Sequence, residues 1–302
     1  ALSDGRILIH VHGAGELVPA FEVLDAVGGG PAELGHTAAV FWAGKMPAAP
    51  FFLAVPMGLV PHEHVAWIEA GGGQALWDAL YAPFGVKPFL AGNTGMSMGG
   101  WFKRELSGSA DLAGLRFAMP GLGGEMWRPL GIVQVSIPPG ERLPALQSGA
   151  IDAAEFAGPF SDLALGFHRA ASFYYWPGLH EPNGAGECLI NRALFEALPA
   201  DLRTVVAEAC RAEHALALAE SERMNAAALA ALVREHGVQL RRFPAAIEAA
   251  AREAAAGILG RFETMGGIEA EIARSYRAML EGQRGWSSIS VRAFLEARGR
   301  EV

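Results

Sequence analysis

The strongest constraint on the fold is a change in residue usage near residue 191. The segments Asn191–Arg234 and Pro244–Gly282 are dense in alanine, leucine, glutamate and arginine, the residues with the highest intrinsic helix propensity. A short stretch between them, Gly237–Phe243, has the pattern of a strand. The last third of the chain is therefore predicted to be mostly long helix.

The first two thirds of the chain differ, because glycine and proline interrupt short apolar runs there. We expect a helix over Pro19–Val27, ended by the glycines that follow it, and a helical stretch over His62–Tyr81, broken at Gly71–Gly73. Strands are predicted at Arg6–Val11, His36–Phe41, Val86–Ala91 and Arg116–Met119. This alternation favours α/β lobes with partly parallel sheets.

Composition supports a globular protein of one large α/β domain or two lobes. The chain has 302 residues, of which 51% are hydrophobic and 19% charged, a balance far from that of disordered chains. The formal net charge of −8 argues against electrostatic binding of nucleic acid.

Targeting and redox signals are few. The longest apolar stretch, Met46–Pro61, contains prolines and is shorter than the roughly 20 residues that a membrane span needs. The chain does not open on a basic segment followed by an apolar one, so no secretion signal is expected in it, as in a processed protein. Two cysteines, Cys188 and Cys210, are expected to be buried thiols.

One short motif favours a serine esterase. The segment Gly95–Gly99 fits the G-x-S-x-G nucleophile elbow with Ser97 as nucleophile, and His12–Gly15 is typical of an oxyanion-hole loop. The acid and base that would complete the set are Asp162 or Asp201 with His214 or His236. However, the polar turn Gly92–Gly95 precedes the elbow where a buried strand should stand, so a glycine loop without catalysis is the alternative.

Two pairs of histidines, His10 with His12 and His62 with His64, are spaced as metal ligands can be. Neither pair has a third ligand at a recognisable spacing. Solvated or locally hydrogen-bonded histidines are therefore expected.

An ordered series of longer motifs resembles one family, the solute-binding subunits of tripartite ATP-independent periplasmic (TRAP) transporters, known as DctP, and especially its 2-oxo-acid-binding branch. The series comprises Gly15–Pro19, Phe41–Lys45, Gly92–Gly95 with Met98–Phe102, Pro120–Glu125, Ala145–Glu155 and Tyr174–Glu181. The motifs stand in the family's order over most of the first two hundred residues. The helical last third also suits the family.

The resemblance implies an α/β, two-lobed periplasmic solute-binding fold with a central cleft and long C-terminal helices. The first lobe would comprise residues 1–93 and about 188–240, the second 94–187, and a C-terminal helical segment 241–302. The protein would capture a small organic acid in the periplasm, deliver it to TRAP membrane subunits and catalyse no reaction.

The resemblance also implies a signal peptide, then a first strand and helix, ahead of Arg6–Val11. They are not in this chain. Either the first lobe is truncated at its N-terminal part or the protein departs from the family there.

The family's carboxylate-binding arginine falls on an alanine in this chain. The motif Gly-Leu-Lys-x-Arg-x-Pro corresponds to Gly114–Pro120, and its arginine position is Ala118. Arg116 lies two residues earlier, on the same strand face, but the family usually has a solvated lysine there. The main counter-charge for an acid is therefore missing from its expected place.

The resemblance further implies a cation, Na⁺ or Ca²⁺, beside the ligand. Its ligands would be a glutamine, here Ser97, the carboxylate of Glu155 and the main-chain carbonyl of Phe156, since hard cations favour oxygen ligands. Glu187 is a further acidic residue of the cleft, with a surface carboxylate as the alternative.

These substitutions leave the ligand open between three cases: a 2-oxo acid or related monocarboxylate, a more neutral or larger molecule, and no tight ligand in a degenerate family member. Aromatic walls for the cleft are expected from Phe41, Trp101, Phe156 and Trp176, with burial in the core as the alternative for each.

A long C-terminal helix mediates dimers among the related 2-oxo-acid binders. The resemblance therefore predicts a homodimer through the alanine-rich run Ala245–Leu259. Packing of this helix on its own lobes is the alternative.

Overall fold

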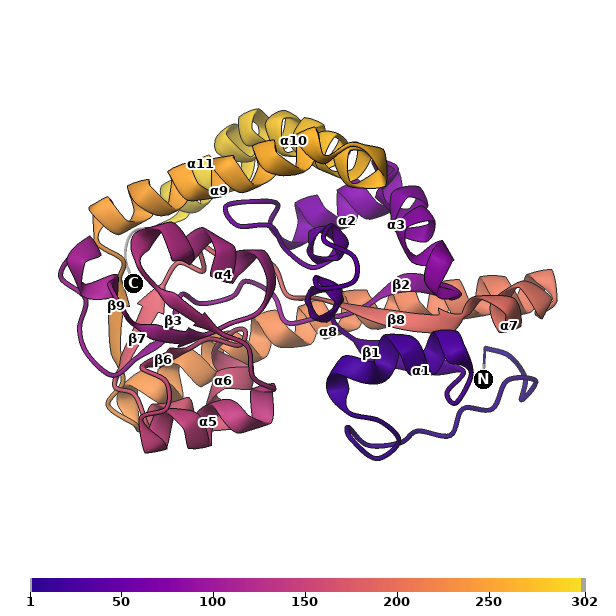
Figure 1. Ribbon diagram of the computed structural model, residues 1–302, viewed down its shortest axis with the longest axis horizontal. Coiled ribbons are helices and arrows are strands. Elements are labelled where there is room, and N and C mark those ends of the chain that lie inside the picture. The colour runs from indigo at the N-terminus through magenta and orange to yellow at the C-terminus, as the bar shows by residue number, and fades with distance from the viewer. Residues whose placement is uncertain (1, 300–302) are drawn as a thin grey trace.

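The structure is a computed structural model that describes residues 2–299. Two β-sheets lie side by side, with one long helix running past both and a pair of helices arching over them (Figure 1). The N-terminal residues as far as Thr37 lie beside the smaller sheet.

The smaller sheet has three antiparallel strands. Its central strand is β8 (Ala185–Asn191), flanked by β1 (Leu34–Thr37) and β2 (Val86–Asn93). The helices around this sheet are α1 (Val23–Gly29), α2 (Pro61–Ala70), α3 (Gly73–Tyr81) and α7 (Arg192–Ala197). Glycine ends α1, because Gly30 adopts the left-handed conformation with φ of 102°.

The larger sheet has six strands in the order β5-β4-β6-β3-β7-β9. Their bounds are β3 (Gly100–Phe102), β4 (Arg116–Ala118), β5 (Val133–Val135), β6 (Ala153–Ala154), β7 (Phe173–Trp176) and β9 (Gln239–Arg242). β4 is parallel to β5 and β6, β9 is parallel to β7, and β3 is antiparallel to both its neighbours. The prediction of a partly parallel sheet is confirmed for this sheet, whereas the smaller sheet is antiparallel throughout.

Short helices accompany the larger sheet and position the loops at its strand ends. They are α4 (Gly121–Trp127), α5 (Pro139–Ser148) and α6 (Pro159–Leu165). A small core of Trp101, Tyr174, Ala118, Ala154 and Leu146 lies on one face of this sheet.

Three connections join the two sheets. The segments 94–99 and 177–184 link β2 to β3 and β7 to β8, and α8 (Ala200–Arg234) leads from the smaller sheet to β9 in the larger one. α8 contacts both β2 and α6 (Figure 1). The two-lobed architecture expected from the resemblance is confirmed.

The helical C-terminal third is confirmed. α9 (Ala245–Met265) and α10 (Gly267–Ser287) arch from β9 over to α2 and α3 (Figure 1). A π-helical turn, Ser288–Arg292, and α11 (Ala293–Arg298) follow. The phenol of Tyr276 on α10 accepts a hydrogen bond of 2.7 Å from the backbone N–H of Leu59, which ties the arch to the first lobe.

Three expectations for chain segments differ from the structure. The predicted strand Arg6–Val11 is wrong: the segment pairs with no strand among residues 2–299, and Leu8 and Val11 are 80% and 89% exposed. An apolar alternation cannot form a strand without a partner edge. The strand predicted at His36–Phe41 is β1, and a 3₁₀ turn, Ala39–Trp42, follows it. β9 belongs to the second lobe's sheet, although residues up to 240 were assigned to the first lobe.

The exact lobe limits stay a prediction, and their outer ends at residues 1 and 300–302 lie outside the described residues. Over residues 2–299, no helix combines the length and apolar character that crossing a membrane requires.

Candidate functional site

Three loops meet where the second lobe faces the first. The backbone N–H of Met98 donates to the carbonyl of Ala157 at 3.0 Å, and that of Gly99 donates to Tyr175 at 2.7 Å. Gly178 lies so close to Ser97 that a Cβ there would collide with the Ser97 carbonyl oxygen. The segments around residues 97, 155 and 178 therefore form one constellation.

Glu155 lies at the centre of this constellation, directly after β6. Its Oε1 is 3.3 Å from Nη1 of Arg142 on α5, and its Oε2 is 3.4 Å from Nε2 of His180. Nη1 of Arg142 also donates to the main-chain carbonyl of Glu155. All three side chains are buried: Arg142 and Glu155 are each 2% exposed and His180 is 0% exposed.

Several polar atoms of this cluster have no hydrogen-bond partner among the described residues. They are Oε2 of Glu155 and both ring nitrogens of His180, whose approach to Glu155 lacks hydrogen-bond geometry. Buried unpaired polar atoms are rare, and each costs about 1–3 kcal/mol. Such atoms also occur elsewhere in the described chain, for example at His64 and Trp127, but here three of them gather where the two lobes are connected.

The ionisation of the two carboxyls of the cluster differs. Burial raises the pKa of Glu155, but nearby His180 and the charge of Arg142 outweigh burial, so its pKa lies below the usual range. Glu181, the next residue after His180, is also buried, and burial together with the charge of Glu155 holds its pKa well above the usual range. The cluster thus combines a guanidinium with two buried carboxyl groups whose pKa values are shifted in opposite directions.

Ser97 belongs to the constellation, but not as a nucleophile. It lies in the loop between β2 and β3 rather than on a strand-to-helix turn, and its hydroxyl makes no hydrogen bond with any residue of 2–299. The proposed bases lie elsewhere: His214 is 3.4 Å from the Asn93 amide, and His236 packs on His168. The esterase alternative has no support in this geometry.

The acids proposed for that esterase are also engaged elsewhere. Asp201 pairs with Arg6 at 2.6 Å on the surface. Asp162 on α6 accepts hydrogen bonds from Nε1 of Trp101 at 2.8 Å and from Oη of Tyr174 at 2.7 Å. Burial raises the pKa of Asp162 to about 7, against the effect of these two donors.

Glu187 is buried in the first lobe, not on the surface. Its oxygens accept hydrogen bonds from Nε1 of Trp42 at 2.6 Å and from Oη of Tyr81 at 3.0 Å. Burial raises the pKa of Glu187 to about 8, although both hydrogen bonds oppose the shift. Each of its two oxygens has a hydrogen-bond donor from its own lobe.

Ala118 is fully buried in the small core of the second lobe, and its carbonyl accepts a hydrogen bond of 3.3 Å from the backbone N–H of Glu155. Arg116 does not reach the constellation. Its guanidinium binds Asp152 at 2.9 Å and the carbonyl of Gly149 at 2.8 Å, half-exposed on the outer side of the lobe.

The four aromatic residues expected to line the cleft lie in different surroundings in the structure. Phe156 is half-buried, with its ring centre 5.7 Å from the Arg142 guanidinium. Trp101 is in the core, stacked on Tyr174 at 4.0 Å between ring centres, and Trp176 is turned outward beside Arg242. Phe41 borders a depression of about 220 Å³ together with Pro120 and Gly121, where the two lobes touch.

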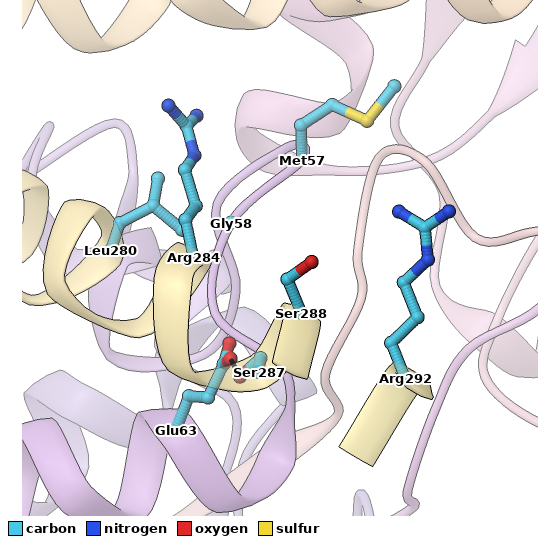
Figure 2. A pocket seen from close by; sticks show the side chains of 8 residues that line it. All are labelled: Met57, Gly58, Glu63, Leu280, Arg284, Ser287, Ser288 and Arg292. Atoms are coloured by element: carbon cyan, nitrogen blue, oxygen red, sulfur yellow. Dashed lines mark hydrogen bonds between the residues drawn. The ribbon is translucent and has the colours of Figure 1, made fainter. Parts of the chain in front are cut away.

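A second depression, of about 270 Å³, lies between α2 and the end of α10 and is shown in Figure 2. It contains the exposed arginines Arg284 and Arg292 and the carboxylate of Glu63. Glu63 is already satisfied, because it accepts hydrogen bonds from the backbone of Val60 and the hydroxyl of Ser287. This depression is a helix junction without the unpaired buried atoms of the interlobe constellation.

The residues expected to bind the cation can be compared with their positions in the structure. No three His, Cys, Asp or Glu side chains in the described chain are grouped to hold a metal. At Glu155, Oε1 and the main-chain carbonyl already face a guanidinium. Ser97 offers a short hydroxyl, and Glu187 is committed to Trp42 and Tyr81, so Oε2 of Glu155 and the Phe156 carbonyl are the members of the expected donor set that remain for a cation.

Sequence reasoning missed Arg142, His180 and Glu181. The last two lie in the motif Tyr174–Glu181, which was recognised only as a family signature. Arg142 follows Pro138, Pro139 and Glu141 at the start of a helix, where an arginine is typically solvated. No local signal distinguishes it from a surface arginine.

Comparisons with known proteins agree with this architecture. The family model described as bacterial extracellular solute-binding protein, family 7 (DctP), matches residues 1–264. A curated relative, the monocarboxylate 2-oxoacid-binding periplasmic protein of Nostoc sp., is 42% identical over 232 residues, which are 77% of this chain. The match spans 64% of that relative's length.

Solved structures are similar over 98% of this chain. A TRAP transporter solute-binding protein from Bordetella bronchiseptica, with copurified calcium and picolinate, is 33% identical with a TM-score of 0.95 and 88% of its chain covered. Two periplasmic TRAP proteins are each 35% identical with a TM-score of 0.94 and 90% of their chains covered. The one from Pseudoalteromonas atlantica has bound sodium and pyruvate, and the one from Colwellia psychrerythraea has bound calcium and pyruvate.

Proposed function

This chain belongs to the DctP family of bacterial extracellular solute-binding proteins, and we propose that it captures a small organic acid in the periplasm and delivers it to the membrane subunits of a TRAP transporter. The ligand is a small monocarboxylate of the size of pyruvate or picolinate. The similar proteins hold these two molecules in a fold that matches almost all of this chain.

The observation that carries this proposal is the buried unpaired cluster around Glu155. A solute-binding protein must bury its ligand between two lobes and meet the ligand's polar atoms with its own. Oε2 of Glu155 and the ring nitrogens of His180 have no partners among the described residues, at the place where the interlobe segments 94–99 and 177–184 meet the end of β6. The carboxylate of a bound acid would accept hydrogen bonds from the His180 ring, while Oε2 of Glu155 is an acceptor and needs a donor such as a ligand hydroxyl or a water, or a cation.

The ligand-binding set that follows has six members. Ser97, Glu155 and Phe156 come from the family pattern, while Arg142, His180 and Glu181 come from the geometry of the cluster. Ala118 contributes through its carbonyl bond to Glu155 and through the space its small side chain leaves. Trp101 and Trp176 serve the fold, since one stacks in the core and the other faces Arg242.

The test is a titration of the purified chain with pyruvate, picolinate and other small carboxylates, with and without Na⁺ or Ca²⁺. Binding of at least one acid should release or absorb heat and raise the melting temperature with ligand concentration, because a ligand of the folded state stabilises it. The contrary result is no binding together with hydrolysis of p-nitrophenyl acetate that disappears in Ser97→Ala. Neither binding nor hydrolysis would identify a degenerate member.

A homodimer through the C-terminal helices is the second part of the proposal. The run Ala245–Leu259 itself packs on this chain's own core through Ile247, Ala251 and Ile258. The exposed apolar residues lie further along, at Trp286, Ile289, Val291, Phe294 and Leu295. Because a cluster of exposed apolar side chains favours association, light scattering should give twice the mass of one chain, and Trp286→Glu with Phe294→Glu should give one mass.

A further inference from the structure

Because alanine stands at position 118, another residue must supply the positive charge of this binding site. Arg142 is the only arginine that is buried among residues 2–299. It comes from α5, which follows β5, the strand paired with β4 at Ala118 and Val135. Burying a guanidinium is costly unless its charge and hydrogen bonds are used, so its position needs a functional account.

Arg142 and position 118 meet at the same residue. The carbonyl of Ala118 accepts from the backbone N–H of Glu155, and Nη1 of Arg142 donates to the carbonyl of that same Glu155. The guanidinium therefore reaches the end of β6 from the helix, beside the strand position where the family pattern has its arginine. The alanine at 118 and the arginine at 142 are therefore neighbours through Glu155.

The guanidinium has capacity left for a ligand. Nε donates to the Ile137 carbonyl at 3.4 Å and Nη1 serves Glu155, whereas Nη2 makes no hydrogen bond with the described residues. The ring of Phe156 lies 5.7 Å from the guanidinium carbon and helps to hold the group in place. A guanidinium has five N–H donors in a planar fork, so it can bind one carboxylate of the protein and a second one from a ligand.

The same guanidinium opposes a metal ion at this place. A cation bound to Glu155 would lie beside the Arg142 guanidinium, and two positive charges at that separation repel each other. Oε1 and the main-chain carbonyl of Glu155 already face Nη1. The protein oxygen atoms that remain from the expected donor set are Oε2 of Glu155, the Ser97 hydroxyl and the main-chain carbonyl of Phe156, three where calcium takes six or more oxygen ligands.

From these contacts we infer that Arg142 is the specificity-determining group of this site: its guanidinium holds the ligand's carboxylate and replaces both the arginine missing at Ala118 and the metal cation. The inference rests on the proposed function, because it presupposes that an acid binds here. It adds that capture of a small monocarboxylate is independent of Na⁺ and Ca²⁺. His180, 3.4 Å from Glu155, provides a second N–H donor for the same carboxylate.

The test is calorimetric titration of pyruvate and picolinate into the full chain, in sodium-free buffer with a chelator and then with added Na⁺ or Ca²⁺. The affinity should change by less than about threefold between these buffers. Arg142→Ala should weaken binding by about 10- to 100-fold, the range expected for a lost charge-assisted hydrogen bond. Arg116→Ala is the matched control, since Arg116 pairs with Asp152 in the same lobe, and it should bind as the wild type does.

A rescue experiment separates binding from folding. Ala118→Arg in the Arg142→Ala background returns a guanidinium from the strand side and should restore at least part of the affinity. If Arg142→Ala does not fold by circular dichroism, Arg142→Lys carries the test, because it keeps a charge near Glu155 but loses the fork and should still weaken binding.

The outcomes are distinguishable. Binding by Arg142→Ala or Arg142→Lys equal to that of the wild type, or binding that appears only with Na⁺ or Ca²⁺, overturns this inference and leaves the proposed function standing. Failure of the wild type to bind either acid or any other small carboxylate in any buffer overturns the proposed function, and the role of Arg142 with it.

Discussion

Glu155 in the second lobe and Glu187 in the first are both buried glutamates at strand positions, yet different groups surround their oxygens. Glu187 is held by two neutral aromatic donors, Trp42 and Tyr81. Glu155 has a charged partner, Arg142, on one oxygen and no hydrogen bond on the other. A carboxyl group with a hydrogen-bond donor on each oxygen stabilises its lobe. A carboxyl group that has one oxygen without a hydrogen bond, beside a buried charge, can bind a ligand.

Asp162 has the same kind of hydrogen-bond donors as Glu187. It lies in the second lobe, close to the binding constellation, but a tryptophan and a tyrosine, Trp101 and Tyr174, hold it as Trp42 and Tyr81 hold Glu187. Burial raises the pKa of both carboxyls, to about 7 and about 8. Glu155 and Glu187 therefore differ because of their hydrogen-bond partners and not because they lie in different lobes. Four measurements test this difference.

The largest expected effect comes from breaking the buried ion pair. Glu155→Ala should lower the free energy of unfolding by about 3–5 kcal/mol, because it leaves the Arg142 guanidinium buried without a counter-charge. Glu196→Ala, which breaks the exposed pair with Arg192, should cost about 0–1 kcal/mol. Urea denaturation of both variants gives the comparison. Equal losses in the two would show that the Glu155 pair is no different from a surface pair.

The next effect is a pH dependence that Asp162 imposes. Its pKa is about 7 in the folded protein, above the usual value of 3.8, so the unfolded chain gives up this proton at lower pH. The stability from this group is complete below about pH 4 and is lost as the pH rises toward 7, by on the order of 3 kcal/mol. Asp162→Asn should therefore flatten the decline in stability between pH 4 and 7. Parallel curves for wild type and variant would contradict the raised pKa.

A smaller effect is expected from the carboxyl of the first lobe. Glu187→Ala leaves the Trp42 and Tyr81 donors unpaired and should cost about 2 kcal/mol, while Glu187→Gln keeps an acceptor and should cost less than half as much. Chemical denaturation at a pH below 7, where the native carboxyl is protonated, measures both. A glutamine variant as unstable as the alanine variant would mean that the two hydrogen bonds do not hold this region.

Sequence reasoning reached the parts of the molecule that are decided locally. Helices α9 and α10 follow from alanine, leucine and glutamate content, and α2 and α3 from the break at Gly71–Gly73. The sequence does not predict in the same way which distant segments pair as strands. Arg6–Val11 has a strand pattern but no partner, and β9 joins β7, more than sixty residues earlier in the chain.

The site was accessible only where family motifs pointed to it. Ser97, Glu155 and Phe156 came from the resemblance, and the structure brings them to one constellation. Arg142 could not be predicted, because its burial depends on how α5 packs beside β6, and a helix-start arginine has no sequence pattern of its own. The family pattern predicts a missing counter-charge at Ala118, but the sequence does not indicate from which element another arginine could come.

The smallest effect concerns a third satisfied carboxylate, Glu63, at the depression in Figure 2. It accepts a backbone hydrogen bond at the start of α2 and another from Ser287 at the end of α10. A carboxylate with donors on both oxygens is expected to have a structural role. Ser287→Ala should therefore lower the free energy of unfolding by about 1 kcal/mol and leave the affinity for pyruvate unchanged. Thermal melting and calorimetric titration of this variant measure the two quantities. A loss of pyruvate affinity in Ser287→Ala would show that a carboxylate with complete partners can also serve the ligand, and the distinction drawn from Glu155 and Glu187 would fail.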